Sequence, residues 1–239
     1  MRSYKWWSVF SKALVLTHLL YALPGNAVVN VDTTRIIFSA NESSQTLNIK
    51  NSADNPTIVQ IWSDDGDLMQ SPELSRAPLF AMPPVMKLIP DEQRSIRLVL
   101  TSTHSLPEDR ESLYWLNIYQ IPALAKKTGT AQRKIVLPLR LRLKIFIRPA
   151  QLSAPKAEDV QRLRFKMRDK ILSIDNPTPW FMSLRLQIGA NMKVNDILVA
   201  PKTHQTLPIS QPVQANENVS FEVFDDDGNP VRYSANLGA

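Results

Sequence analysis

Cysteine is absent from the sequence, and histidine occurs only three times in 239 residues. The lack of cysteine excludes a disulfide scaffold, so stability must come from a buried core, which 44% hydrophobic residues permit. His18, His104 and His204 are far apart, and no set of residues has the spacing of a metal site or a catalytic triad. We therefore expect no metal, no cofactor and no enzymatic activity.

Long apolar runs are also missing, except for one near the N-terminus. Three basic residues precede the apolar run 13–23, and small residues follow it at 24–27. This pattern is typical of a cleavable secretory signal peptide, and the run is too short for a comfortable membrane span. We expect residues 1–27 to be removed, so that an exported mature chain begins at Val28.

Excess charge is small. The first 27 residues hold three of the 28 Lys and Arg residues and none of the 22 Asp and Glu residues, which leaves the mature chain with a net charge of +3. Such a balance does not indicate a nucleic-acid-binding protein. The basic residues nevertheless concentrate between Arg133 and Arg148, where they could attract phosphates, acidic surfaces or a carboxylate.

The same region contains the longest alternating stretch, residues 133–149. Pro138 within it lacks a backbone N–H, and proline in strands is largely confined to edges and bulges, so we expect part of this strand at a sheet edge. A long apolar edge invites pairing with another chain. Two interpretations stay open: a core strand with a basic outer face, or an edge that exists to be paired. The alternation has the period of a half-buried strand and consists of Ile135, Leu137, Leu139, Leu141, Leu143, Ile145 and Ile147.

Short strands separated by turn residues fill the rest of the mature chain. Residues 28–149 contain seven or so such segments and no convincing helical period, which indicates an immunoglobulin-like sandwich. After a linker around Pro155, residues 150–239 offer a second set of short strands. We expect an all-β protein with two domains, 28–149 and 150–239. The acidic turn 225–228 lacks the spacing of a calcium loop and is interpreted as a solvated turn.

Several motifs resemble, in order and spacing, the periplasmic pilus chaperones of the PapD-like family. The resemblance is close over 28–150 and looser after it. The segments that carry it are 31–38, 82–90, 106–122 and 143–149, continued by 176–180 and by the turn 225–230.

The resemblance implies two immunoglobulin-like domains arranged in an L, with a cleft between them. It also implies a periplasmic chaperone that binds, folds and caps pilus or fimbrial subunits, whose own fold lacks one strand. In this donor-strand complementation the chaperone lends a strand to the subunit, an example of β-strand addition. The chaperone then delivers the subunit to an outer-membrane usher, as in the chaperone–usher pathway of fimbrium biogenesis.

The lent strand corresponds to the first part of the alternating stretch. By resemblance, the side chains that enter the subunit groove are Ile135, Leu137, Leu139 and Leu141. Pro138 removes one backbone donor from this strand, and the sequence leaves open how it fits a strand that is meant to pair.

Two further sets of residues match charged positions of the family. Arg35 and Lys144 occupy the positions that anchor the C-terminal carboxylate of the subunit. Glu111, Arg148 and Asp225 occupy those of an interdomain salt bridge, with Asp226 as a rival for Asp225.

Other function classes remain as alternatives. The main one is an exported pilus subunit or adhesin, which should carry a free N-terminal donor peptide. An exported hydrolase or sugar-binding protein would need a pair of acidic residues that the sequence does not offer convincingly, and a binder of anionic polymers rests on the basic cluster alone. The sequence does not identify the subunit or the usher, and it leaves self-association of the free chaperone open.

Overall fold

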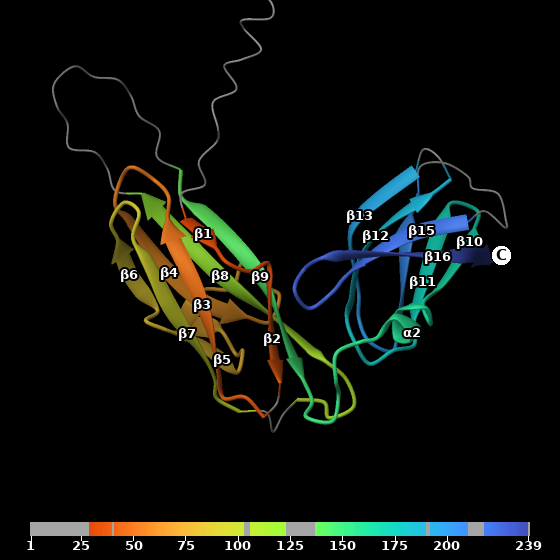
Figure 1. Cartoon of the computed structure of the whole chain (residues 1–239), viewed down its shortest axis with the longest axis horizontal. Helices are drawn as coiled ribbons and strands as arrows, with labels where there is room; N and C mark the ends of the chain where they lie inside the picture. Colours follow the sequence, from red (N-terminus) through yellow and green to blue (C-terminus); the bar gives the residue numbers. More distant parts are fainter. Residues whose placement is uncertain are drawn as a thin grey trace, which may run out of the picture.

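The structure is a computed structural model that describes residues 29–39, 41–102, 106–122, 137–189, 192–209 and 218–238. The predicted signal peptide, His104 and Ile135 lie outside these residues. Strands dominate the described chain, which forms two lobes set at an angle to each other (Figure 1). No helix in this part of the chain is long and apolar enough to cross a membrane.

The first lobe packs two sheets face to face. One has the strand order β1-β3-β7-β5, with bounds Val29–Val31, Ser44–Asn51, Gln93–Leu100 and Leu79–Met82. The other has the order β2-β9-β8-β4-β6, with bounds Arg35–Ser39, Leu139–Arg148, Ser112–Pro122, Thr57–Asp64 and Val85–Leu88. A short 3-10 helix, η1 (Pro72–Leu74), lies between β4 and β5.

Alternation along the strands supplies the core between these sheets. In β3, β4 and β7, every second residue along most of the strand is buried. In the second half of β9, residues 145–148 are all buried. Fully buried members include Phe38, Leu47, Ile49, Ile96, Ile118 and Ile145. Because side chains of a strand alternate between its two faces, the charged residues between these positions lie on the outer faces of the sheets.

The second lobe is built from one hydrogen-bonded set of strands in the order β13-β12-β15-β16-β10-β11-β14. Strand β13 contacts β11 and β14 at the far end of this order, so the sheet folds over a core that includes Phe165, Leu172, Ile174 and Phe221. In chain order, β10 to β16 span Arg164–Arg168, Ile171–Asn176, Met182–Ile188, Met192–Val199, Thr203–Pro208, Asn218–Phe224 and Pro230–Gly238. The predicted all-β class with two sandwiches is confirmed.

Some elements differ from the sequence expectation. The proline-rich stretch 78–90 contains two strands, β5 and β6, and the last strand, β16, was not predicted at all. The expected linker contains a short helix, α2 (Ala157–Val160). Within the described residues, the long strand expected over 133–149 begins only at Leu139.

The lobes meet where β9 ends. From Arg148 the chain passes to α2, and the turn between β15 and β16 reaches from the second lobe toward β2 and β9 (Figure 1). Residues of β2 and β9 therefore share one region with residues of the second lobe, although they are far apart in the sequence.

Candidate functional site

Strand β9 has two halves with different neighbours. On one side, β8 pairs with its whole length, from Gln120 opposite Leu139 to Ser112 opposite Ile147. On the other side, β2 pairs in parallel only with residues 144–148. In the described part of the chain, no strand covers this second edge over residues 139–143, which we call the open half of β9.

The apolar side chains change exposure along the same line. Leu137 is 68% and Leu139 is 48% exposed, Leu141 is half-buried, and Leu143 is buried. Exposed large apolar side chains beside an unpaired strand edge form a surface on which another chain can add a strand. The structure thus brings together three of the four residues predicted for the lent strand, and Ile135 is not described.

Pro138 lies directly before β9 and is exposed. The ladder with β8 begins one residue later, at Leu139. The missing N–H of Pro138 therefore interrupts no bond of the ladder between β8 and β9, in keeping with the tolerance of strand ends for proline.

Arg35 and Lys144 stand directly opposite each other in the parallel pairing of β2 with β9. The Arg35 guanidinium donates a hydrogen bond of 3.1 Å to the backbone carbonyl of Phe224 and lies 5.5 Å from the centre of the Phe224 ring. The Lys144 ammonium lies 5.7 Å from the ring centre of Trp115. The predicted anchor residues are thus neighbours at the region where the lobes meet.

Burial makes this pair of cations unusual. It lowers the pKa of Arg35, and it lowers the pKa of Lys144, which the nearby Arg35 charge lowers further. Among the described residues, neither side chain has a carboxylate within ion-pair distance, and the buried Nε of Arg35 has no hydrogen-bond partner. Two half-buried cations with unused donors favour the binding of an anion between them.

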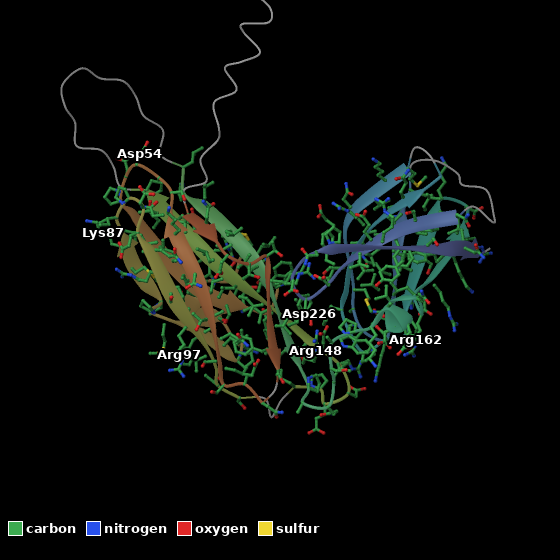
Figure 2. All side chains as sticks on the ribbon, in the orientation of Figure 1. Asp54, Lys87, Arg97, Arg148, Arg162 and Asp226 are labelled. Carbon is green, nitrogen blue, oxygen red and sulfur yellow. The ribbon has the colours of Figure 1, made fainter. Side chains whose placement is uncertain are left out.

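The interlobe salt bridge involves Asp226 instead of the predicted Asp225. Arg148 donates from Nε to Glu111 at 2.9 Å, and its two terminal nitrogens donate to the Asp226 carboxylate at 2.9 Å each. Figure 2 labels Arg148 and Asp226 in the region where the lobes meet. Asp225 instead accepts a hydrogen bond from the backbone N–H of Asn229. The prediction of Asp225 was wrong because this side chain closes the turn, which leaves the next carboxylate to face Arg148.

Glu111 ties the lobes together through its second oxygen as well. That oxygen accepts a 2.9 Å hydrogen bond from the backbone N–H of Phe181, and the Glu111 N–H donates to the carbonyl of Pro179. Burial raises the pKa of Glu111 above its ordinary value, although Arg148 and the Phe181 N–H act in the opposite direction. Glu111 thus connects Arg148 of the first lobe to the backbone of the second.

Two more interlobe contacts were missed by sequence reasoning. The Lys202 ammonium lies 2.5 Å from the Asp109 carboxylate, and with Arg110 it lowers the Asp109 pKa to about 2. Gly228, at a φ of +87°, lies so close to Thr34 that a Cβ would overlap its hydroxyl. No local pattern in the sequence marks either contact, because both join segments about 90 residues or more apart.

A cluster of buried charge on the outer face of the first lobe was also missed. Asp64, at the end of β4, forms ion pairs with Arg140 and Arg142 of β9. The alternation of basic residues on β9 was visible in the sequence, but nothing in the sequence identified their acidic partner. In the described part of the chain, no group of three or more His, Asp or Glu residues could hold a metal ion.

Comparison with known proteins identifies this architecture. The family described as "Pili and flagellar-assembly chaperone, PapD N-terminal domain" matches residues 28–153, and "Pili assembly chaperone PapD, C-terminal domain" matches residues 158–235. The two matches follow one another along the chain and together cover most of it.

Curated relatives agree with the family match. The chain is 29% identical to the chaperone protein MrkB of Klebsiella pneumoniae, over 88% of this chain and 91% of the relative. It is 26% identical to the chaperone protein FimC of Escherichia coli K12, over 90% of this chain and 86% of the relative.

Solved structures of chaperones have the same fold. The CupB2 chaperone of Pseudomonas aeruginosa matches with a TM-score of 0.73 and 29% identity, over 87% of this chain and all of the other. A structure of the Salmonella enterica SafA pilin in complex with the SafB chaperone matches with a TM-score of 0.75 and 26% identity, over 87% of this chain and 96% of the other. The chain therefore belongs to the PapD-like family of pilus-assembly chaperones.

Proposed function

We propose that this chain captures pilus subunits in the periplasm by lending them the open half of β9, and then delivers them to an outer-membrane usher. The observation that carries this proposal is the unpaired edge over residues 139–143, where Leu139 is exposed, together with the exposed Leu137 just before it. A solved structure holds the SafA pilin in complex with the SafB chaperone, which supports a pilus subunit as the partner. The chaperone acts by strand pairing and requires no catalytic group.

Burial of the leucines supplies the driving force. Each large apolar side chain that passes from water into a subunit groove contributes roughly 1.5–3 kcal/mol. The leucines Leu137, Leu139 and Leu141, together with Ile135, would supply several kcal/mol, set against an association cost of at least ~4 kcal/mol. Backbone hydrogen bonds along the open edge would fix the register of the added strand.

Arg35 and Lys144 are proposed to anchor the C-terminal carboxylate of the subunit. Their facing positions on β2 and β9 support this role, as does the lack of a carboxylate within ion-pair distance among the described residues. Charge-assisted hydrogen bonds from two half-buried cations are stronger than neutral ones and would set the subunit in register with the open half.

In this proposal, the residues of the salt bridge between the lobes keep the two domains at a fixed angle. Residues 28–149 and 150–239 form the two domains, and Glu111, Arg148 and Asp226 hold the angle between them. A signal peptide over residues 1–27 would direct the chain to the periplasm and then be removed.

The anchor is tested by co-expression of a pilus subunit with the Arg35→Ala or the Lys144→Ala protein, followed by measurement of the subunit that co-purifies. We expect a loss of at least roughly tenfold with either variant, because a buried carboxylate would lose a charged partner. Arg97→Ala and Lys87→Ala are matched controls, since both remove an exposed cation from other parts of the first lobe (Figure 2). Undiminished recovery with both anchor variants would refute the anchor.

The lent strand is tested separately by Leu137→Asp. Because Leu137 is 68% exposed, the variant should fold normally but fail to retain the subunit, whose groove cannot accept a charge. Leu74, on η1, is also 68% exposed, so Leu74→Asp is the matched control and should leave capture unchanged. Normal co-purification with Leu137→Asp would contradict the proposed role of β9.

A further inference from the structure

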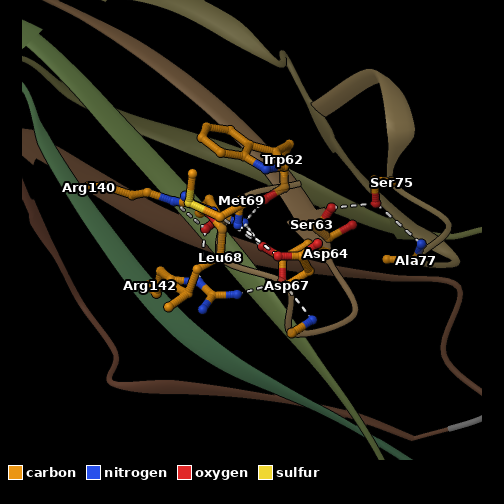
Figure 3. Close-up of polar contacts among 12 residues, drawn as sticks. Trp62, Ser63, Asp64, Asp67, Leu68, Met69, Ser75, Ala77, Arg140 and Arg142 are labelled. Carbon is orange, nitrogen blue, oxygen red and sulfur yellow. Dashed lines mark hydrogen bonds and ion pairs between the residues drawn. The ribbon is translucent and has the colours of Figure 1, made fainter. Parts of the chain in front are cut away.

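A second feature of β9 lies on the face opposite its leucines. Arg140 and Arg142 alternate with Leu139, Leu141 and Leu143 and point to the outer face of the sheet. Both converge on the carboxylate of Asp64, which has no exposed side-chain surface (Figure 3). The terminal nitrogens of Arg142 and Arg140 lie 2.5 Å and 3.4 Å from its two oxygens.

The neighbouring strand β8 completes this cluster. Asn117 donates from its amide nitrogen to Asp64 at 2.6 Å, and its amide oxygen accepts from the Nε of Arg140 at 2.8 Å and of Arg142 at 3.0 Å. Each arginine also stacks on an indole, Arg140 at 4.9 Å from the ring centre of Trp62 and Arg142 at 4.7 Å from that of Trp115. We refer to Asp64, Asn117, Arg140 and Arg142 as the Asp64 cluster.

The cluster also fixes the loop that follows β4. A terminal nitrogen of Arg140 donates to the carbonyl of Leu68 at 2.7 Å (Figure 3). The N–H of Gly66 donates to Asp64 at 2.8 Å. The cluster therefore links β4, β8, β9 and the loop in one hydrogen-bonded unit, in which the buried carboxylate is fully compensated.

The position of the Asp64 cluster matters because the open half of β9 has fewer structural restraints than residues 144–148. Residues 144–148 are held by β2 on one edge and by core packing of Ile145 and Ile147. Residues 139–143 have no second neighbouring strand among the described residues, and Leu139 is exposed. Apart from the ladder with β8 and the packing of Leu141 and Leu143 on the core, the Asp64 cluster is what restrains this half.

We propose that the Asp64 cluster holds the open half of β9 extended and in register before a subunit arrives, so that Arg140 and Arg142 are positioning residues for subunit capture. This inference rests on the proposed function in its role for β9. A strand that is already ordered loses less conformational entropy on binding, so preorganisation strengthens association without adding contacts to the partner. The outer face thus adds to the core packing of Leu141 and Leu143 and compensates for the missing neighbouring strand.

The experiment is amide hydrogen exchange of the free chaperone, with no subunit present, on the wild type and on Arg140→Lys. Lysine keeps the charge but cannot reach Asp64, Asn117 and Leu68 together or stack in the same way. We expect exchange of the amides in 139–143 that donate to β8 to become at least roughly tenfold faster, since each tenfold change corresponds to about 1.4 kcal/mol. The amides of β3 and β7 in the same lobe should keep their wild-type rates.

A matched control is available in the second lobe. Arg185 on β12 pairs with Glu222 and stacks on Phe224, at 5.3 Å from the ring centre, so Arg185→Lys makes the same chemical change away from β9. It should leave exchange in 139–143 unaltered. Asp64→Asn provides a second variant with a larger expected effect, and the milder Arg140→Lys still decides the question if Asp64→Asn does not fold.

Two outcomes would overturn the inference. One is wild-type exchange over 139–143 in Arg140→Lys, and the other is an equal acceleration throughout the first lobe, which would indicate a general stabilising role. Both can be recorded without a subunit, so they are independent of the Leu137→Asp experiment. Faster local exchange together with normal capture by Leu137→Asp would uphold the cluster and reject the proposed function.

Discussion

The two halves of β9 have apolar residues on every second position but different surroundings, and Phe146 in the second half replaces one of the basic residues between them. In the second half, Ile145 and Ile147 are no more than 2% exposed and β2 covers the outer edge. In the open half, Leu139 is 48% exposed and no strand of the described chain pairs with that edge. One strand thus contributes to the core of its own domain at one end and presents an unpaired edge at the other.

The two halves of β9 show that one alternating sequence pattern can occur both in a covered strand and in a strand with an unpaired edge. Alternation determines which side chains share a face of a strand, but it does not determine what covers that face. In β9 the difference arises from β2. Strand β2 begins at Arg35, which pairs with Lys144, so the residues of β9 before Lys144 have no partner in β2. The position of Arg35 and Lys144 at this boundary places the proposed anchor beside the proposed lent segment.

The largest expected effect is on stability in the second half of β9, residues 144–148, which β2 covers and which we call the closed half. Ile145→Ala removes a fully buried side chain and should lower the free energy of unfolding by about 2–5 kcal/mol, measured by urea denaturation. Leu139→Ala in the open half should change it by no more than about 0.5 kcal/mol. Equal losses from the two substitutions would contradict the distinction between the halves.

Subunit binding should respond in the opposite sense to stability. Leu139→Ala removes most of a side chain that contributes roughly 1.5–3 kcal/mol in the subunit groove, so we expect affinity for a purified subunit to fall by about tenfold or more. Isothermal titration or a competition assay measures this change. Ile171→Ala, which shortens an exposed side chain of the second lobe, should leave affinity at the wild-type level, and an unaffected Leu139→Ala would argue against burial of this leucine.

The salt bridge at the end of the closed half should show a smaller effect. Asp226→Asn weakens two charge-assisted hydrogen bonds to Arg148 and should cost about 1–2 kcal/mol and broaden the distribution of interlobe angles. Asp225→Asn should cost less, because an amide oxygen can still accept from the N–H of Asn229. Denaturation and small-angle scattering measure the two effects, and a larger effect of Asp225→Asn would reverse the assignment.

The smallest expected effect is the pH dependence at the boundary between the halves. Burial and Arg35 lower the pKa of Lys144 in the free chaperone, and a bound carboxylate should raise it again. Subunit affinity should therefore fall as pH rises through the lowered pKa, below the ordinary 10.5. Over the same range the unfolded chain binds more protons, so the contribution of Lys144 to stability should rise with pH.

Lys144→Arg provides the control for this linkage. Arginine stays charged over the range in which the lysine titrates, so affinity of the variant should depend less on pH. Measurement of affinity at several alkaline pH values checks the prediction, and identical pH profiles for the two proteins would assign the dependence to another group.

Much of the fold was predictable because strand periodicity is local. The apolar residues around Ile49 and Ile96 alternate clearly, as expected of the short strands predicted over residues 28–149, and the structure has β3 and β7 there. Strand β16 was missed although Val231, Tyr233, Ala235 and Leu237 occupy every second position. Only Leu237 of this set is buried, and the alternating residues are not the large aliphatic ones that mark the other strands. Strands β5 and β6 are four residues each and are separated by prolines, so the turn signals concealed them.

The candidate site was predictable only where the family motifs fixed it. Arg35 and Lys144 were predicted and lie opposite each other, and the pairing of Arg148 with Glu111 also matches the prediction. The choice of Asp225 failed because Asp225 and Asp226 are the same residue type, and only the backbone of the turn decides which carboxylate faces Arg148. The Asp64 cluster joins segments more than 50 residues apart, and a sequence read along one strand cannot reveal such a partner.

The central claim is that residues 139–143 form an edge that a subunit completes. Hydrogen exchange of wild-type chaperone, alone and with a purified pilus subunit bound, tests it most directly. We predict that amides of 139–143 that point away from β8 become protected by at least roughly tenfold in the complex, while those of 144–148 change little because β2 already covers that edge. A complex in which 139–143 gain no protection would contradict the account.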